Sequence, residues 1–260
     1  MPQPKGYVDL EFLTVTGNLF NHIKQRSYTR MQIQPGHMVL DLGCGPGIDT
    51  ISLARLVGVN GQVIGADYDE AMIAEADQRA EQAEVNTWVK HQCVNAISLP
   101  YETDYFDSCR SERLFEHLLN PVQALSEMTR VTKSGGWVVV LDTDWGSLSI
   151  DSDEIDIERR LARFMAESFL HNGYSGRKLY RLFKQQNLAD ISFEVFPVAT
   201  TNYALARQAT QAEKNEQEAL KAGVISSEEL QRWQTSLQQA DSEGIFFCSV
   251  NVMLFAGRKD

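Results

Sequence analysis

The feature that most constrains the fold of this chain is a glycine-rich turn between an apolar segment and a helix-like segment. Residues 38–42 read Met-Val-Leu-Asp-Leu, as expected of a short buried strand, and the turn Gly43-Cys44-Gly45-Pro46-Gly47 follows before a helical pattern over residues 48–57. Because glycine carries no side chain, such a turn bends sharply and lets a ligand approach the backbone. This order predicts an α/β fold that binds a nucleotide-like ligand at the turn.

Strands and helices alternate along the rest of the chain. The predicted strands are residues 38–42, 62–67, 87–94, 106–110, 137–141, 191–198 and 245–257. The predicted helices are residues 17–33, 48–57, 70–84, 121–130, 151–170, 176–186, 203–222 and 227–240. The regular alternation before about residue 150 predicts a parallel sheet with helices on both faces, and the later strands extend it to a doubly wound, Rossmann-like sheet of seven strands. The helices before the last strand are expected to form a lid between two neighbouring strands.

Length and charge narrow the domain organisation and the partners. We expect the 260 residues to form one domain overall, with an N-terminal cap helix region at 1–35, a ligand-binding core at 36–150, and a lid with closing strands at 151–260. The 35 Asp and Glu against 24 Lys and Arg give a net charge of −11, which argues against nucleic-acid or anionic-membrane partners.

Apolar runs and cysteine spacing indicate the cellular compartment. The sequence has no run of ~18 apolar residues that would span a membrane, and its four cysteines are too widely spaced to suggest a disulfide framework or a metal site. We therefore expect a cytoplasmic protein that binds a small-molecule substrate and no metal, as a monomer or homodimer.

The spacing of the glycines separates two classes of ligand. A dinucleotide site has the pattern G-x-G-x-x-G, whereas here Gly47 comes one position early and Ile48 stands at the dinucleotide position. Asp41, two residues before the first glycine, is unsuited to a pyrophosphate and suited to a cationic ligand. Asp67, 20 residues after Gly47, could accept hydrogen bonds from both ribose hydroxyls, as NAD sites also do.

With these residues in place, the sequence resembles the class I S-adenosylmethionine-dependent methyltransferases. The resemblance is to the small-molecule branch (methyltransferase type 11) typified by ubiquinone and menaquinone biosynthesis enzymes, and it covers residues 34–144 without a gap. The motifs occur in the family's order: the loop at 39–47, Asn-Ala-Ile-Ser-Leu-Pro-Tyr at 95–101, Tyr-Phe-Asp at 105–107, Leu-Phe-Glu-His-Leu at 114–118, and Glu-Met-Thr-Arg-Val-Thr-Lys-Ser-Gly-Gly at 127–136.

The resemblance implies S-adenosylmethionine as cofactor and S-adenosylhomocysteine as product. It places Asp41 near the amino-acid end of the cofactor, Asp67 at the ribose and Tyr68 beside the adenine. Asn95 replaces the family's usual aspartate, and either accepts a hydrogen bond from the adenine amino group or only caps a loop. The residues expected at the cofactor are Asp41, Gly43, Gly45, Gly47, Asp67, Tyr68, Asn95, Ala96 and Arg110.

The residues expected to act on the acceptor follow the fourth and fifth strands, because ligands in open α/β sheets bind beyond the carboxyl ends of strands. Glu112 is expected to bind an amine or take its proton, or else to form a self-satisfied ion pair with Arg113. His117 is a second candidate base, and its alternative role is a structural one in which the side chain only caps or packs. Asp144 is the third catalytic candidate, and Trp145 and Tyr28 join Glu112 and Arg113 as expected substrate contacts.

These residues lead to one favoured function and two alternatives. Glu112, Asp142 and Asp144 would make the mouth of the pocket acidic, so we favour N-methylation of a small amine-containing metabolite. The first alternative is O- or C-methylation of a quinone-like or natural-product acceptor. The second is a protein that senses S-adenosylmethionine without turnover, or a subunit that a partner activates.

Overall fold

The computed structural model describes residues 20–260, in which a seven-stranded sheet has the order β3-β2-β1-β4-β5-β7-β6. Strands β1 to β5 run parallel, whereas β7 is antiparallel to both β5 and β6. The strands are β1 (Met38–Leu42), β2 (Gln62–Asp67), β3 (Val89–Cys93), β4 (Phe106–Glu112), β5 (Thr132–Ile150), β6 (Ala189–Thr200) and β7 (Cys248–Arg258).

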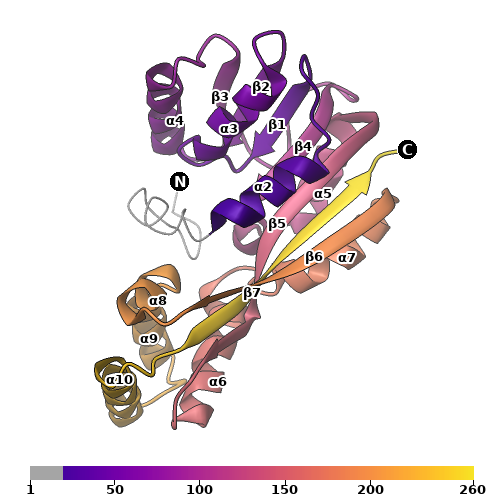
Figure 1. The fold of residues 1–260 in the computed structure, drawn as a ribbon. Coiled ribbons are helices and arrows are strands. Elements are labelled where there is room, and N and C mark those ends of the chain that lie inside the picture. The colour runs from indigo at the N-terminus through magenta and orange to yellow at the C-terminus, as the bar shows by residue number, and fades with distance from the viewer. Residues whose placement is uncertain (1–19) are drawn as a thin grey trace.

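The prediction of a seven-stranded, Rossmann-like sheet is confirmed. The strands before residue 150 run parallel, as their alternation with helices predicted, and β7 is antiparallel to both of its neighbours. A parallel neighbour would need a connection that returns the chain to the starting end of β6. Instead, the segment after β6 stays at one end of the strands, so β7 runs back beside it (Figure 1).

Helices cover both faces of the sheet, and alternate residues of each strand pack against them. Val139 and Leu141 of β5 belong to the core beneath α2 and α3, and Val138 and Val140 belong to the core beneath α5 and α7. The helical segments are α2 (Asn21–Arg30), α3 (Ile48–Val57), α4 (Glu70–Gln82), η2 (Phe115–His117), α5 (Pro121–Val131), α6 (Ile155–Phe164), η3 (Met165–Phe169), α7 (Ser175–Gln185), α8 (Tyr203–Ala209), α9 (Ala212–Lys221) and α10 (Ser227–Ser242).

A lobe with its own hydrophobic core surrounds the C-terminal end of β5 and the N-terminal end of β7. Leu148 of β5 packs there with Leu161 of α6, Ala219 of α9 and Trp233 of α10. Figure 1 shows α6, α8, α9 and α10 gathered around this extension of the sheet. We call these four helices the lid; the predicted divisions of the chain at residues 35 and 150 stay predictions.

Local sequence signals located several element boundaries. Asn120 accepts a hydrogen bond from the backbone of Gln123 at the start of α5, and Ser226 and Glu229 form the predicted capping box of α10. The predicted helix 17–33 is described only from residue 20, and its helical part ends at Arg30. None of the helices within residues 20–260 has the length and apolar character needed to cross a bilayer.

Candidate active site

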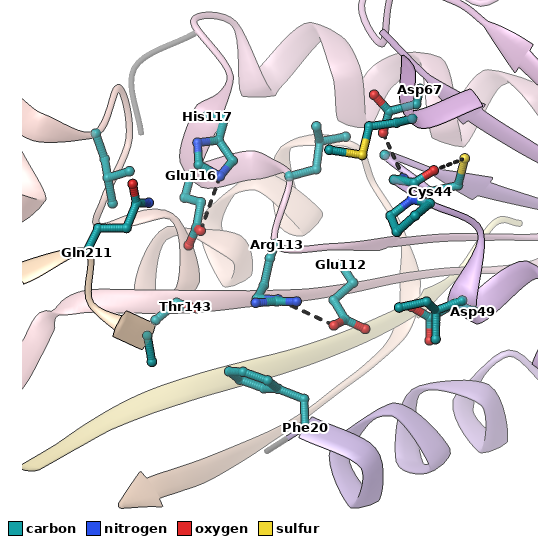
Figure 2. Close-up of a pocket in the computed structure, with 18 of the residues that line it drawn as sticks. Phe20, Cys44, Asp49, Asp67, Glu112, Arg113, Glu116, His117, Thr143 and Gln211 are labelled. Atoms are coloured by element: carbon teal, nitrogen blue, oxygen red, sulfur yellow. Dashed lines mark hydrogen bonds and ion pairs between the residues drawn. The ribbon is translucent and has the colours of Figure 1, made fainter. Parts of the chain in front are cut away.

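One cavity of about 840 Å³ lies at the carboxyl ends of β1, β2 and β4 and continues under the lid. Ligand pockets range over ~300–1,000 Å³, so this one has room for a cofactor and a second small molecule. Figure 2 shows Asp67 at one end, Glu116 and His117 at the other, and Glu112 and Arg113 between them.

The glycine loop forms the wall of the cavity nearest β1. Gly43, Gly45 and Gly47 have φ of +76°, +50° and +74°, a region that glycine adopts at little cost. Gly43 and Gly45 line the cavity, whereas Gly47 faces α4, where an added Cβ would lie 2.8 Å from the Cβ of Ala76. The loop therefore presents bare backbone to the cavity and lets α4 pack closely behind it.

Asp67 fixes the other side of this loop. One oxygen of its carboxylate accepts a hydrogen bond from the Gly45 N–H at 2.8 Å, and the other accepts from the Asp69 N–H at 3.0 Å. Burial raises the pKa of Asp67 above its usual value although these donors oppose the shift. Tyr68 also lines the cavity and is 41% exposed.

The loop after β3 supplies Val94 and Asn95 to the cavity lining. Asn95 lines the cavity, and its side-chain oxygen accepts a hydrogen bond from the Ile97 N–H at 3.1 Å, so it does cap its own loop. An amide oxygen has a second lone pair, which leaves it able to accept from a ligand as well. Ala96 instead packs in the core beneath α5 and α7 and is outside the cavity lining.

A buried ion cluster underlies the middle of the cavity. Arg110, 1% exposed, donates to Asp41 at 2.9 Å and to Glu112, and lies 3.6 Å from Asp49. Burial raises the pKa of Asp41 to about 6, although the charge of Arg110 opposes the shift. Arg110 lines the cavity, whereas Asp41 does not and contacts Arg110.

Helix α2 adds a second cation to this cluster. Lys24 lies 2.6 Å from Asp49 and 3.3 Å from Glu112. Tyr28 donates its hydroxyl hydrogen to Asp49 and Ser27 accepts from Arg110, which binds α2 to the first turn of α3 and to β4. Tyr28 does not line the cavity, so the structure assigns it this tethering contact in place of the expected substrate contact.

Glu112 is therefore surrounded by cations. Its carboxylate contacts Arg110, Lys24 and, at 3.4 Å, the Nε of Arg113, and its side chain is 6% exposed. The guanidinium of Arg113 stacks over the ring of Phe20 at 4.6 Å from the centroid. The ion pair with Arg113 that the sequence left open is thus present, with two further cations, but Oε1 of Glu112 and Nε of Arg113 are buried without a hydrogen bond.

A second polar group lies at the lid end of the cavity. Glu116 is 5% exposed, and its two carboxylate oxygens contact the indole nitrogen of Trp145 at 2.7 Å and Nε2 of His117 at 3.4 Å. Glu116, His117 and Trp145 all line the cavity. Asp142 lies behind them and accepts from the Phe115 N–H and from the hydroxyl of Ser175.

The two aspartates expected at the mouth do not line the cavity. Asp144 is 3% exposed and accepts two hydrogen bonds from Nε of Arg177, at 2.7 and 2.9 Å. Asp142 is fully buried beneath Ser175, a residue of the first turn of α7. Neither carboxylate is placed to meet an acceptor, because both side chains project from the same face of β5 and contact Ser175 and Arg177 of α7.

Most other side chains at the lid end of the cavity are apolar, with the polar side chains of Thr143, Thr200, Thr210 and Gln211 among them. Side chains from β5, η3, β6, α8 and β7 form the apolar surface, and they are Trp145, Met165, Phe169, Leu170, Val198, Ala206, Ala209 and Val250.

Sequence reasoning missed several charged residues that line the cavity, among them Glu116, Lys24 and Asp49. Glu116 was visible only as part of the motif at 114–118, directly before the candidate His117. Lys24 and Asp49 gave no signal beyond their spacing from Tyr28 and from the glycine loop. Within residues 20–260, no three His, Cys, Asp or Glu side chains group as metal ligands would.

Comparisons with known proteins bear on this geometry. A protein of Streptomyces fradiae, the uncharacterized 37.1 kDa protein in transposon TN4556, is 32% identical over 232 residues, which are 87% of this chain and 65% of that protein. The demethylmenaquinone methyltransferase of Bacillus mycoides is 40% identical over 113 residues, which are 44% of this chain and 47% of that enzyme. The matched residues thus span 65% of the first relative and 47% of the second, less than two thirds of either.

A solved structure shares the fold. A candidate methyltransferase of Bacillus halodurans C-125 superposes with a TM-score of 0.65 at 18% identity, over 91% of this chain and 98% of that one. The family model described as "Methyltransferase domain" matches residues 33–241. The chain therefore belongs to the methyltransferase domain family, which confirms the class I S-adenosylmethionine-dependent methyltransferase resemblance of its motifs.

Proposed function

We propose that this protein transfers the methyl group of S-adenosylmethionine to an oxygen or carbon atom of a small, largely apolar molecule and releases S-adenosylhomocysteine. One observation carries the proposal: a single cavity joins the glycine loop and Asp67 to the apolar surface under the lid. The cofactor supplies an activated methyl group, so the protein's task is to position the acceptor and manage its proton.

The residues around the loop suit this cofactor. Gly43 and Gly45 keep side chains away from the cofactor, and Asp67 faces the cavity as an acceptor for ribose hydroxyls. Tyr68 and Asn95 are the adenine contacts in this proposal. Lys24, Arg110 and Arg113 offer donors for the carboxylate of the cofactor's methionine part.

The apolar side chains under the lid favour an oxygen or carbon acceptor over the amine that the sequence suggested, although the Glu116 carboxylate also lines that end of the cavity. That expectation rested on an acidic mouth made by Glu112, Asp142 and Asp144. Glu112 contacts three cations, and the other two carboxylates lie outside the cavity. An apolar acceptor gains ~25 cal/mol for each Å² of surface that it buries under the lid, whereas an ammonium group would lose its hydration there.

The four cysteines are free thiols, which agrees with the cytoplasmic location that forms part of this proposal.

The test is a screen for S-adenosylhomocysteine release with matched acceptor pairs. Each pair shares an apolar body and carries either a phenolic hydroxyl or an alkylamine. We expect release with the phenols or quinols and little with the amines, and an Asp67→Ala variant that loses S-adenosylmethionine affinity by about 10- to 150-fold, as for hydrogen bonds to a charged group worth ~1.5–3 kcal/mol. Asp156→Asn, at a side chain that is 84% exposed, is the control.

Two results would count against the proposal. Binding of S-adenosylmethionine without product from any acceptor would favour the sensor, and turnover of the amines alone would restore nitrogen as the accepting atom.

A further inference from the structure

The proposed function gives no role to the polar group at the lid end of the cavity, which consists of Glu116, His117 and Trp145. Glu116 is nine-tenths buried, lines the cavity and lies among apolar side chains such as Met165 and Leu170. A carboxylate in such surroundings is costly unless it is oriented and hydrogen-bonded. The contacts of Glu116 therefore decide whether it is ionised and what it can do.

Two cavity residues orient the carboxylate of Glu116. The Trp145 indole N–H donates to Oε2 at 2.7 Å, and Nε2 of His117 lies 3.4 Å from Oε1. A carboxylate offers about four lone-pair positions, so each oxygen keeps capacity for a ligand. In Figure 2 the Glu116 carboxylate lies beside His117 at the end of the pocket opposite Asp67.

The ionisation of Asp142 and that of Glu116 influence each other. Burial, and then the charge of Glu116, raise the pKa of Asp142 well above its usual value. Burial also acts to raise the pKa of Glu116, but His117, Trp145 and Arg113 outweigh it and lower that pKa. The pair therefore holds one proton, on Asp142, and leaves Glu116 as the anion that faces the cavity.

Resting on the proposed function, we propose that Glu116 is the residue that takes the proton of the acceptor, with Asp142 and Trp145 as positioning residues. The acceptor then carries an acidic X–H group, X being oxygen or an activated carbon, at the lid end of the cavity. The X–CH₃ bond forms as the S–CH₃ bond breaks, the electron pair of that bond stays on sulfur, and the proton leaves X for an oxygen of Glu116.

This assignment differs from the catalytic candidates that the sequence suggested. Glu112 lies in ion pairs with arginine and lysine side chains, and Asp144 pairs with Arg177 and does not line the cavity. His117 directs Nε2 at Glu116, so in this proposal it orients the base.

The test uses an acceptor identified by the release screen and measures kcat as a function of pH. Glu116→Gln is expected to bind S-adenosylmethionine within about twofold of wild type while kcat falls about 10²- to 10⁴-fold, the usual contribution of a general base. Glu218→Gln, an exposed glutamate of α9, is the matched control and should leave kcat unchanged.

A second variant keeps the test decisive if Glu116→Gln folds poorly. Trp145→Phe removes the hydrogen bond that lowers the pKa of Glu116, so the acidic limb of the kcat profile should move to higher pH. Wild-type kcat for Glu116→Gln, or an acidic limb that Trp145→Phe does not move, would overturn the role of Glu116 and leave the proposed function standing. If wild type releases no S-adenosylhomocysteine with any acceptor, the proposed function itself fails.

Discussion

Glycines of the loop serve two purposes. Gly43 and Gly45 present bare backbone to the cavity, and Gly47 lets α4 pack closely against the loop. The Gly47 φ of +74° demands a left-handed backbone, and a Cβ there would also lie 2.8 Å from the Cβ of Ala76. Gly36 has a φ of +90° with nothing within 4 Å of an added Cβ, so it isolates the cost of the backbone alone.

We predict that Gly36→Ala loses about 1–2 kcal/mol of unfolding free energy, the cost of a left-handed non-glycine residue. Gly47→Ala should lose about 1–3 kcal/mol more, because the Ala76 side chain is overpacked. Urea unfolding of both variants checks this, and equal losses would show that α4 moves aside without cost.

Residue by residue, the sequence located the site better than it assigned the chemistry. Gly43, Gly45 and Asp67 lie at the cavity as expected, because the strand-turn-helix pattern determines their positions. The sequence could not predict that Lys24 pairs with Glu112 or that Arg177 pairs with Asp144, since each cation lies on a helix far away in the sequence.

At the scale of elements, the lid has a core separate from the two cores that flank the sheet. Trp233 of α10 is 2% exposed, packs in that core and donates its indole N–H to the buried Glu216 at 3.1 Å. Replacing a buried tryptophan by alanine costs ~3–5 kcal/mol.

Trp233→Ala is therefore expected to raise amide hydrogen exchange throughout α8, α9 and α10 while β1 and α3 keep wild-type protection. Mass-spectrometric exchange on the intact chain makes the measurement. A uniform rise across β1, α3 and the lid would show that sheet and lid unfold as one unit.

Two elements differ from their sequence-based prediction for identifiable reasons. The predicted helix 203–222 is two helices, because Gln211 adopts a φ of +48° and ends the first at Ala209. Strand β5 extends to Ile150 beyond the predicted residues 137–141, since Ser149 and Ile150 pair with β7 in the lid lobe. Polar residues after Leu141 hid this extension.

For the whole molecule, the buried ion cluster makes stability depend on pH with two opposite signs. The pKa of Asp41 is raised from 3.8 to about 6, so its contribution is fully present below pH 3.8 and is lost as pH rises through 6. For Asp49, burial opposes ionisation, but Arg110 and Lys24 lower the pKa to about 2. Its contribution is present above pH 3.8 and is lost as pH falls through 2.

We predict that Asp41→Asn gains stability relative to wild type as pH rises from about 4 to about 7, because only wild type must ionise a buried aspartate there. Unfolding free energies at both pH values check this. A difference that does not change with pH would place the titrating proton on another group of the cluster.

At the scale of the whole molecule, the proposed function requires cofactor and acceptor to meet in one cavity. The most direct measurement is a single turnover, with enzyme in excess over S-adenosylmethionine labelled in its methyl group and an apolar phenolic acceptor from the screen. We expect the label to appear on the acceptor, with one S-adenosylhomocysteine for each methyl transferred. Label that stays on bound S-adenosylmethionine, with every screened acceptor, would contradict the account.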